Sequence, residues 1–212
     1  MKKNILITGT SKGIGNYVAK NLNDDFNIFG ISRTKSELDL QREINIDLTK
    51  FELFDNLVKN FEQTEIKFDA IILNAGIGYF GRFSSGTDKE YLNIINLNLT
   101  SNILFLKKIE KFLNPKAKII FIGSIIGKKF MKYGAVYQAS KFGLRGFAGA
   151  LKNELKGIGV HIINPKIVDT TFHDEAKIEL NFGENKYTSK DEILACINEI
   201  LNGNEKRFEI DL

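Results

Sequence analysis

The sequence predicts an α/β fold in which a doubly wound parallel sheet of about seven strands forms a single domain. Short apolar runs alternate along the chain with longer segments whose apolar residues recur three and four positions apart, as in amphipathic helices. This alternation is typical of a parallel sheet that helices cover on both faces. The length of 212 residues, 43% of them hydrophobic, suits one large core. No proline-rich linker, repeat or low-complexity tract divides residues 1–212, so we expect one domain.

The predicted strands are seven short apolar runs, and the predicted helices lie between them. The strands are expected at residues 4–8, 27–32, 44–47, 69–73, 118–123, 160–163 and 207–210. The helices are expected at residues 14–23, 51–63, 89–112, 137–156 and 189–201. The connection between residues 32 and 44 is about as short as a parallel crossover can be, so it should hold a turn or a stub of helix. Right-handed crossovers would place a ligand crevice beyond the carboxyl ends of the strands.

A glycine-rich stretch, TGTSKGIG at residues 8–15, joins the first strand to the first helix. Gly9, Gly13 and Gly15 permit positive φ and a close approach of a ligand to the backbone. The free N–H groups at the start of the following helix suit a phosphate or pyrophosphate. The spacing differs from GxxxxGK(S/T) and from GxGxxG, and an ordinary turn can have the same composition. The stretch alone therefore leaves nucleotide binding open.

Composition excludes several other classes of function. Lysine and arginine outnumber aspartate and glutamate by 30 to 26, but the signs alternate along the chain, which disfavours nucleic-acid binding. The first apolar segment is too short for a signal peptide or a membrane span, so we expect a soluble cytoplasmic protein without membrane contact. Cys196 is the single cysteine, and no Cys/His cluster has metal-ligand spacing, so neither a disulfide nor a metal site is expected.

Serine, tyrosine and lysine side chains form a second candidate site far downstream, in FIGSIIGKKFMKYGAVYQASKFG. Tyr137 and Lys141 are four residues apart near the start of a predicted helix, so their side chains share one face. Ser124 follows a predicted strand at the edge where the crevice should open. An ammonium group can stabilise a phenolate, and a hydroxyl can hold a carbonyl oxygen near the phenol. Each residue alone fits a structural role, but the set suits proton transfer at a carbonyl or alcohol oxygen while a hydride moves at carbon.

Together the two sites resemble the short-chain dehydrogenase/reductase (SDR) family over nearly the whole chain. The matching residues are Thr8, Gly9, Gly13, Ile14 and Gly15 in the cofactor turn, Asn74-Ala75-Gly76 after the fourth strand, Asn98 in the long helix, and Ser124, Tyr137 and Lys141 in the catalytic set. The resemblance implies a Rossmann-type domain that binds a nicotinamide dinucleotide.

The resemblance also implies a role for each catalytic residue. Tyr137 would be the general acid in reduction, and Lys141 would lower the pKa of Tyr137 and bind the nicotinamide ribose. Ser124 would orient the substrate carbonyl. Asn98 would hold a water that links Lys141 to solvent, although Asn96 and Asn102 compete for this role within NLNLTSN. The implied cofactor contacts are Gly9, Ser11, Lys12, Gly13, Ile14, Gly15, Arg33, Asp47, Leu48, Asn74, Ala75, Gly76, Tyr137, Lys141, Pro165, Val168 and Thr170.

Basic residues near the cofactor turn favour NADP(H) over NAD(H). Arg33 follows the second predicted strand, where a cation accommodates the 2'-phosphate of NADP and an acidic residue would bind the 2'-hydroxyl of NAD. Lys12 could add a second charge, although both side chains could also be solvated surface cations. Asp47 resembles the residue that accepts from the adenine amino group. Lys166 departs from the family, which usually has glycine there, and it suggests a backbone without positive φ.

The sequence thus predicts an NADPH-dependent carbonyl reductase, or the reverse alcohol oxidation, acting on a small-molecule substrate. Two alternatives are a catalytically idle NADP-binding sensor or interaction protein and a sugar-nucleotide epimerase or dehydratase. The intact Ser-Tyr-Lys set disfavours the first, and the glycine spacing disfavours the second. Lys128, Lys129 and Lys132 could attract an anionic substrate or could simply be solvated.

Two features concern the surroundings of the site. A short substrate lid is expected around residues 171–190, and Phe172, His173, Phe182 and Tyr187 could line it. The helices at 89–112 and 137–156 carry apolar residues on more than one face, so each needs a partner besides the sheet. In the family these helices form a dimer interface, and we expect a homodimer or homotetramer.

Overall fold

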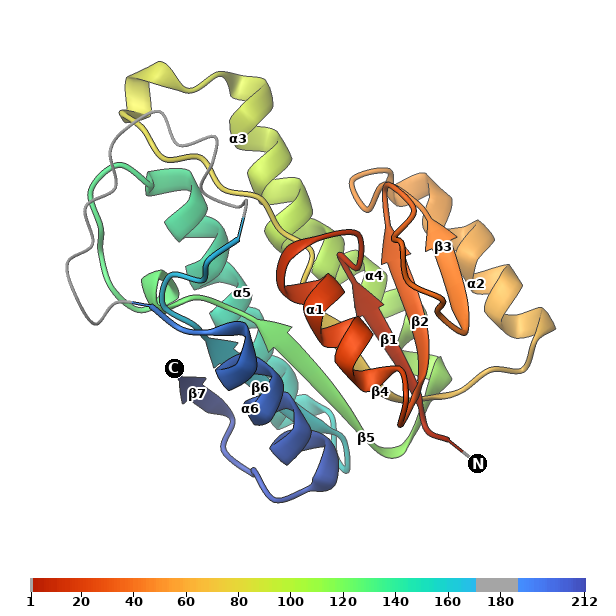
Figure 1. Cartoon of the computed structure of the whole chain (residues 1–212). Coiled ribbons are helices and arrows are strands. Elements are labelled where there is room, and N and C mark those ends of the chain that lie inside the picture. The colour runs from red at the N-terminus through yellow and green to blue at the C-terminus, as the bar shows by residue number, and fades with distance from the viewer. Residues whose placement is uncertain (1, 171–186) are drawn as a thin grey trace.

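A seven-stranded parallel sheet forms the centre of the molecule (Figure 1). The computed structural model describes residues 2–170 and 187–212. The strands are β1 (Asn4–Thr8), β2 (Asn27–Ser32), β3 (Arg42–Asn45), β4 (Phe68–Leu73), β5 (Leu113–Ile122), β6 (Gly159–Asn164) and β7 (Glu209–Asp211). Their order in the sheet is β3-β2-β1-β4-β5-β6-β7, so the chain reverses direction across the sheet between β1 and β4. The predicted doubly wound fold is confirmed.

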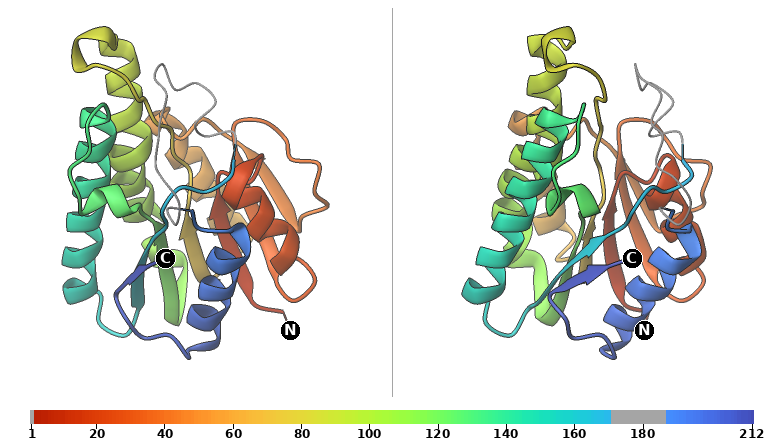
Figure 2. Two further views of the ribbon diagram at one scale, coloured as in Figure 1. Left: turned by 60° about the vertical axis from the view of Figure 1, so that its left-hand side comes forward. Right: turned by 90° about the vertical axis from the view of Figure 1, so that its left-hand side faces the viewer.

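Two helical layers cover the sheet (Figure 2). The helices are α1 (Gly13–Leu22), α2 (Phe54–Gln63), α3 (Asp88–Ile95), α4 (Ser101–Ile109), α5 (Ala135–Glu154) and α6 (Lys190–Asn202). Ile5 and Ile7 of β1 pack in the cluster that contains α1 and α6, whereas Leu6 faces the cluster that contains α2, α4 and α5. Successive residues of a strand point to opposite faces. The strands are therefore continuous apolar runs because both of their faces are buried.

Local sequence signals set several helix ends. Thr87 begins α3 and Ser189 begins α6, each with a glutamate three residues later that completes a reciprocal capping box. Gly203 ends α6 in the left-handed conformation, with a φ of 80°. These caps bind N–H and C=O groups that the helix itself leaves without partners.

The main differences from the predicted elements lie at their ends. The strand expected at 44–47 is β3, two residues earlier, and the strand expected at 118–123 begins at Leu113, which pairs with Phe68. The last strand starts at Glu209 rather than at Arg207, whose N–H is bound by the carboxylate of Glu205. The helix expected at 89–112 consists of α3 and α4, which are separated by a π-helical turn, η3 (Asn96–Thr100).

Candidate active site

A cleft with a volume of about 1380 Å³ lies at the carboxyl edge of the sheet, where the strand order reverses. It brings together most of the residues that the sequence analysis selected, although they are far apart in the chain. The predicted residues that line it are Gly9, Ser11, Lys12, Gly13, Ile14, Arg33, Leu48, Asn74, Ala75, Gly76, Ser124, Tyr137, Lys141, Pro165, Val168 and Thr170. The predicted residues Gly15, Asp47 and Asn98 are not part of this lining.

The glycine turn needs its glycines for two different reasons. Gly9 and Gly13 have φ values of 79° and 63°, in the region that disfavours residues with a side chain. Gly15 is needed for space, because a Cβ atom there would collide with the carbonyl oxygen of Gly9 and the side-chain amide of Asn74. The helix α1 begins at Gly13, and no side chain caps it. The N–H groups of its first turn therefore suit an anion at this end of the cleft.

Asn74 fastens the glycine turn to the end of β4. Its side-chain amide donates to the carbonyl oxygens of Thr8, at 3.0 Å, and Gly9, at 3.4 Å. In return, the hydroxyl of Thr8 accepts the N–H groups of Asn74, at 3.0 Å, and Ala75, at 3.1 Å. These four bonds hold the two loops at the strand-order reversal in one fixed arrangement, so Asn74 shapes the cleft as well as lining it.

Ser124, Tyr137 and Lys141 converge at the other end of the cleft. Ser124 begins the short helix η5 (Ile125–Gly127) just after β5, and its side chain forms a hydrogen bond with that of Tyr137. Lys141 lies one turn further along α5, with its Nζ atom 5.8 Å from the centre of the Tyr137 ring. The same Nζ donates to the carbonyl oxygen of Ile122 at 2.9 Å. All three catalytic candidates are buried, and Phe80 packs edge to face on the Tyr137 ring at 5.3 Å.

Burial moves the pKa values of both ionisable groups toward their neutral forms. Desolvation raises the pKa of Tyr137, and the hydrogen bond with Ser124 offsets only part of this effect. Desolvation also lowers the pKa of Lys141 to about 8. The pKa of Tyr137 is raised overall, and the lowering contribution that the family resemblance implies for Lys141 stays a prediction. The free energy needed to remove the phenolate from water exceeds the stabilisation that the hydrogen bond with Ser124 provides.

Asn98 lies in the π-helical turn, a distortion that often marks functional positions. Its side-chain oxygen accepts the N–H of Ile77 at 2.9 Å, and its amide donates to the Ile77 carbonyl, at 2.8 Å, and to the Ser140 hydroxyl, at 3.0 Å. Ser140 in turn donates to the carbonyl oxygen of Tyr137 at 2.7 Å. The Asn98 side chain thus joins the loop after β4 to the helix turn that carries Tyr137.

The carbonyl oxygen of Asn98 accepts from the side chain of Asn102 at 2.8 Å. Asn102 therefore supports Asn98 rather than replacing it. The water-holding role that the family resemblance implies for Asn98 stays a prediction.

The opposite end of the cleft carries the cations expected to select the cofactor. Arg33 follows β2, and Lys12 precedes α1; both are exposed and line the cleft. The carboxylate of Asp47 accepts the N–H and hydroxyl of Thr49 at 2.9 and 2.8 Å. Burial opposes the ionisation of Asp47, but these two bonds and the charge of Arg33 outweigh it and lower its pKa. The adenine contact assigned to Asp47 stays a prediction.

The segment after β6 is described as far as Thr170. Pro165 and Val168 are buried, and Thr170 approaches Gly13 across the cleft. Positive φ among the described non-glycine residues is confined to Glu65, Lys116 and Tyr133. Lys166 therefore has the ordinary backbone that the sequence suggested, and its N–H donates to the Thr188 hydroxyl at 3.0 Å. The expected lid at 171–190 lies outside the described residues, except for its last four positions.

Several residues that line the cleft were missed in the sequence analysis. Ile77, Phe80 and Met131 belong to loops, where apolar residues follow no helical or strand period. For Met131, the apolar residues near it in the stretch between Ser124 and Tyr137 were an available signal.

The three lysines in that segment have different surroundings. Lys129 lines the cleft. Lys128 instead pairs with Asp211 at 2.7 Å, and the Nζ of Lys132 lies 4.9 Å from the centre of the Tyr133 ring. Within residues 2–170 and 187–212, no cluster of His, Cys, Asp and Glu could hold a metal ion, and no helix is both long and apolar enough to cross a membrane.

Comparison with known proteins places this fold and site in a family. Residues 3–180 match the family model described as short chain dehydrogenase. A 3-ketodihydrosphingosine reductase of Bacteroides thetaiotaomicron is 31% identical over 188 residues, which cover 86% of this chain and 70% of that protein. A 3-oxoacyl-(acyl-carrier-protein) reductase of Buchnera aphidicola is 30% identical over 205 residues, which cover 89% of this chain and 82% of that protein.

A solved structure agrees with this assignment. A short chain dehydrogenase family protein from Francisella tularensis superposes with a TM-score of 0.86, covering 100% of this chain and 97% of its own, at 25% identity. The fold and the site define an α/β oxidoreductase with a nucleotide-binding cleft. The chain belongs to the short-chain dehydrogenase family.

Proposed function

We propose that the protein is an NADP(H)-dependent oxidoreductase that reduces a carbonyl group to an alcohol, or catalyses the reverse reaction, with Tyr137 as general acid or base. The convergence of Ser124, Tyr137 and Lys141 at one end of a cleft whose other end is the glycine turn carries the proposal. The two curated relatives are named as reductases of keto and oxo compounds, which supports carbonyl chemistry.

The residues of the cleft fit a nicotinamide dinucleotide. At one end, α1 begins at Gly13 without a side-chain capping bond from Lys12, so the N–H groups of its first turn suit a phosphate. A side chain at Gly9 would occupy space next to Asn74 and Ala75. At the other end, Lys141 has three N–H donors and gives one to the Ile122 carbonyl, which leaves donors for the hydroxyls of a ribose. When bound, the dinucleotide supplies or accepts the hydride.

The protein's own residues handle the proton. The Ser124 hydroxyl, already hydrogen-bonded to the phenol, can hold the substrate oxygen beside it. In reduction, Tyr137 donates its proton to that oxygen as the carbonyl carbon gains the hydride. The ammonium of Lys141, on the same side of α5, then stabilises the phenolate by its charge. Because the pKa of Lys141 is about 8, this charge is mostly present at pH 7.

The preference for NADP(H) rests on Arg33 and Lys12. Both are exposed cations on the lining of the cleft, and Arg33 directly follows the carboxyl end of β2. A guanidinium group can bind a phosphate with two parallel N–H donors, whereas it offers no comparable contact to a ribose hydroxyl.

We also propose that the protein is a homo-oligomer that pairs through α4 and α5. Leu99, Ile103, Phe142 and Phe147 on or beside these helices stay only partly buried in the single chain. Contact with a second copy would remove this apolar surface from water.

Tyr137→Phe tests the proposed chemistry, because it removes only the phenolic oxygen. NADPH oxidation with a good carbonyl substrate should fall by roughly 10²- to 10⁴-fold, as expected for the loss of a general acid. NADPH affinity, measured by fluorescence titration, should change little. Tyr133→Phe, in the neighbouring loop, is the matched control and should retain activity.

Turnover retained in Tyr137→Phe would refute the acid role. Tight NADPH binding by the wild type, with no turnover of any carbonyl or alcohol in a broad panel, would instead favour the idle sensor.

A further inference from the structure

A third apolar cluster surrounds Tyr137, separate from the two clusters that cover the faces of the sheet. Phe80, Ile94 and Tyr137 form its buried centre, and each of them is at most 5% exposed. The partly buried members are Ile77, Tyr79, Tyr91, Ile126, Met131 and Val136. Most of the cluster also lines the cleft, so the phenol lies at the edge of an apolar wall.

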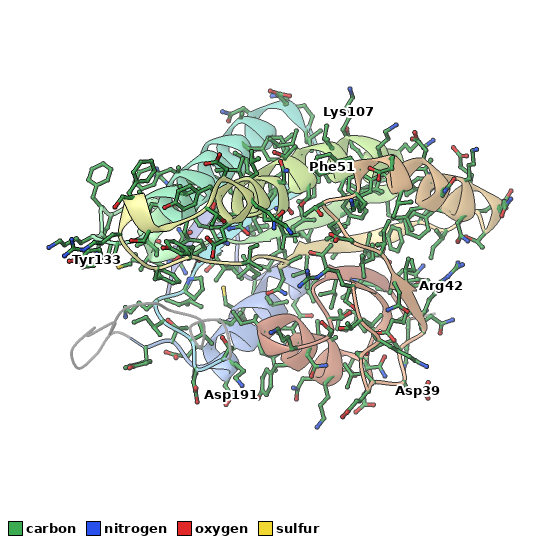
Figure 3. The ribbon with its side chains drawn as sticks, turned by 90° about the horizontal axis from the view of Figure 1, so that it is seen from above. Asp39, Arg42, Phe51, Lys107, Tyr133 and Asp191 are labelled. Atoms are coloured by element: carbon green, nitrogen blue, oxygen red, sulfur yellow. The ribbon has the colours of Figure 1, made fainter. Side chains whose placement is uncertain are left out.

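This wall lies at the end of the molecule opposite the second and third strands. Tyr133, in the loop that carries part of the wall, and Arg42, at the start of β3, are at opposite sides of the molecule in Figure 3. The glycine turn and Arg33 belong to the β1–β2 side. The apolar wall is therefore in the half of the cleft away from the phosphates and adenosine, where the nicotinamide and the substrate would both lie.

The loop that carries the wall is fixed to the catalytic helix. Gln138, next to Tyr137 in α5, accepts the N–H of Met131 at 2.7 Å and donates to its carbonyl oxygen at 2.5 Å. The carbonyl of Tyr133 accepts the N–H of Gly81 at 2.9 Å. These bonds hold Met131 beside the phenol without any contribution from a ligand.

The wall continues outward through an exposed aromatic ring. Phe130 is 92% exposed and lines the cleft, and its ring stacks on that of Phe142 at 5.4 Å with an interplanar angle of 4°. An apolar ligand that binds against an exposed ring at the rim of a cleft removes apolar surface from water, which favours binding.

Apolar side chains outnumber polar ones in the described lining of this half of the cleft, where the polar members include Glu90, Asn93 and Lys129. The carboxylate of Glu90 is engaged with the N–H and hydroxyl of Thr87 in the cap of α3. A polyhydroxylated substrate would bury hydroxyls against Phe80, Ile94 and Met131 without partners, and each such hydroxyl costs free energy.

We propose that the substrate is a ketone, or the corresponding secondary alcohol, that carries an apolar chain of several carbons. Its oxygen lies at Ser124 and Tyr137, and its chain lies along Phe80, Met131 and Phe130. This assignment rests on the proposed carbonyl reduction and adds the chemical class of the substrate to it.

A series of methyl ketones from 2-butanone to 2-decanone tests the assignment, with NADPH and NADH oxidation as the readout. The value of kcat/KM should rise about fourfold for each added methylene until the chain passes Phe130, which corresponds to ~0.8 kcal/mol per buried methylene. Dihydroxyacetone and erythrulose serve as polar ketones of similar reactivity and should be poor substrates. Phe130→Ser should reduce the ratio of kcat/KM for 2-decanone over 2-butanone by about fivefold, as the loss of ~1 kcal/mol of apolar contact predicts.

Phe83→Ser is the matched control for Phe130→Ser. Phe83 is also an exposed and stacked ring, at 68% exposure, but it is not part of the lining of the cleft. The ratio should stay unchanged in this variant. A flat or falling series, preferred turnover of the polar ketones, or equal effects of the two variants would overturn the apolar-chain assignment and leave carbonyl reduction standing. No turnover of any ketone with either cofactor would overturn both proposals.

Discussion

Replacing Lys141 by methionine should abolish activity and stabilise the fold at the same time. The side chain is buried at a place where an ammonium group has little contact with water, and the pKa of Lys141 accordingly falls from 10.5 to about 8. Methionine has a similar unbranched shape and fills the same space without a charge. The variant therefore removes a group that the proposed mechanism requires and whose burial as a cation disfavours folding.

The size of the effect follows from the pKa of Lys141. A fall from 10.5 to about 8 corresponds to about 3 kcal/mol of destabilisation while both states are protonated. The methionine variant also lacks the hydrogen bond that Lys141 donates to the Ile122 carbonyl, which stabilises the fold by ~1 kcal/mol. The net gain is about 2 kcal/mol at pH 6, or roughly 4–8 °C in Tm for a domain of this size.

The gain should depend on pH in a defined direction. Because the pKa of Lys141 is lower in the folded state, the unfolded chain binds more protons between about pH 8 and 10.5, and wild-type stability rises with pH in that window. Near pH 9.5, burial of Lys141 still destabilises the wild type by about 1 kcal/mol. The hydrogen bond that methionine cannot form is worth about the same, so the two effects cancel. The advantage of Lys141→Met should therefore shrink from about 2 kcal/mol at pH 6 to near zero at pH 9.5.

Urea unfolding followed by circular dichroism, without cofactor, measures both values. Lys156→Met, at an exposed position just beyond α5, is the control and should shift stability by less than about 0.5 kcal/mol. A Lys141→Met variant that is less stable than wild type at pH 6, or a gain that does not change with pH, would refute the claim that the lysine is a buried, destabilising cation.

Two further predictions concern the cofactor end of the cleft. Arg33→Ala should weaken NADPH binding roughly 10- to 100-fold, the loss expected for a charge-assisted phosphate contact, while its affinity for NADH changes less than about threefold. In the control variant Lys35→Ala, the affinity for NADPH should also change less than about threefold. Equal losses for both cofactors in fluorescence titrations of Arg33→Ala would contradict a 2'-phosphate contact. Gly15→Ala should lower the free energy of unfolding by roughly 1–3 kcal/mol, because the added Cβ meets Gly9 and Asn74, and unchanged stability in urea would show that the turn can give way.

The sheet could be predicted from the sequence because the apolar runs that favour strands locally are also the residues that the fold buries. β1 and β2 are apolar on both faces and have a polar residue at each end, Asn4 and Thr8 in β1 and Asn27 and Ser32 in β2, so their limits were predicted to the residue. The register of β5 could not be read in this way. Its first residues pair with β4 through Leu113 and Phe68, across an irregularity that only the partner strand creates.

The site was predictable where chemistry restricts residue type and unpredictable where packing decides. Ser124, Tyr137 and Lys141 could be found by their functional groups and spacing. The π-helical turn at Asn98 could not, because it accompanies contacts with Ile77 and Ser140, which lie 21 and 42 residues away. The raised pKa of Tyr137 has a similar origin, since it results from burial that no local pattern encodes.

The pKa shifts of Tyr137 and Lys141 share one cause, and in the proposed mechanism both would favour proton donation. A phenol with a raised pKa is protonated at neutral pH and can give its proton to a carbonyl oxygen, while Lys141, with a pKa of about 8, still carries the charge that stabilises the phenolate. Oxidation of an alcohol needs the phenolate first, which alkaline pH favours. Above pH 8, however, Lys141 loses the charge on which that phenolate depends. In the proposed mechanism, the requirements of reduction would therefore be met together near neutral pH, whereas those of oxidation would conflict.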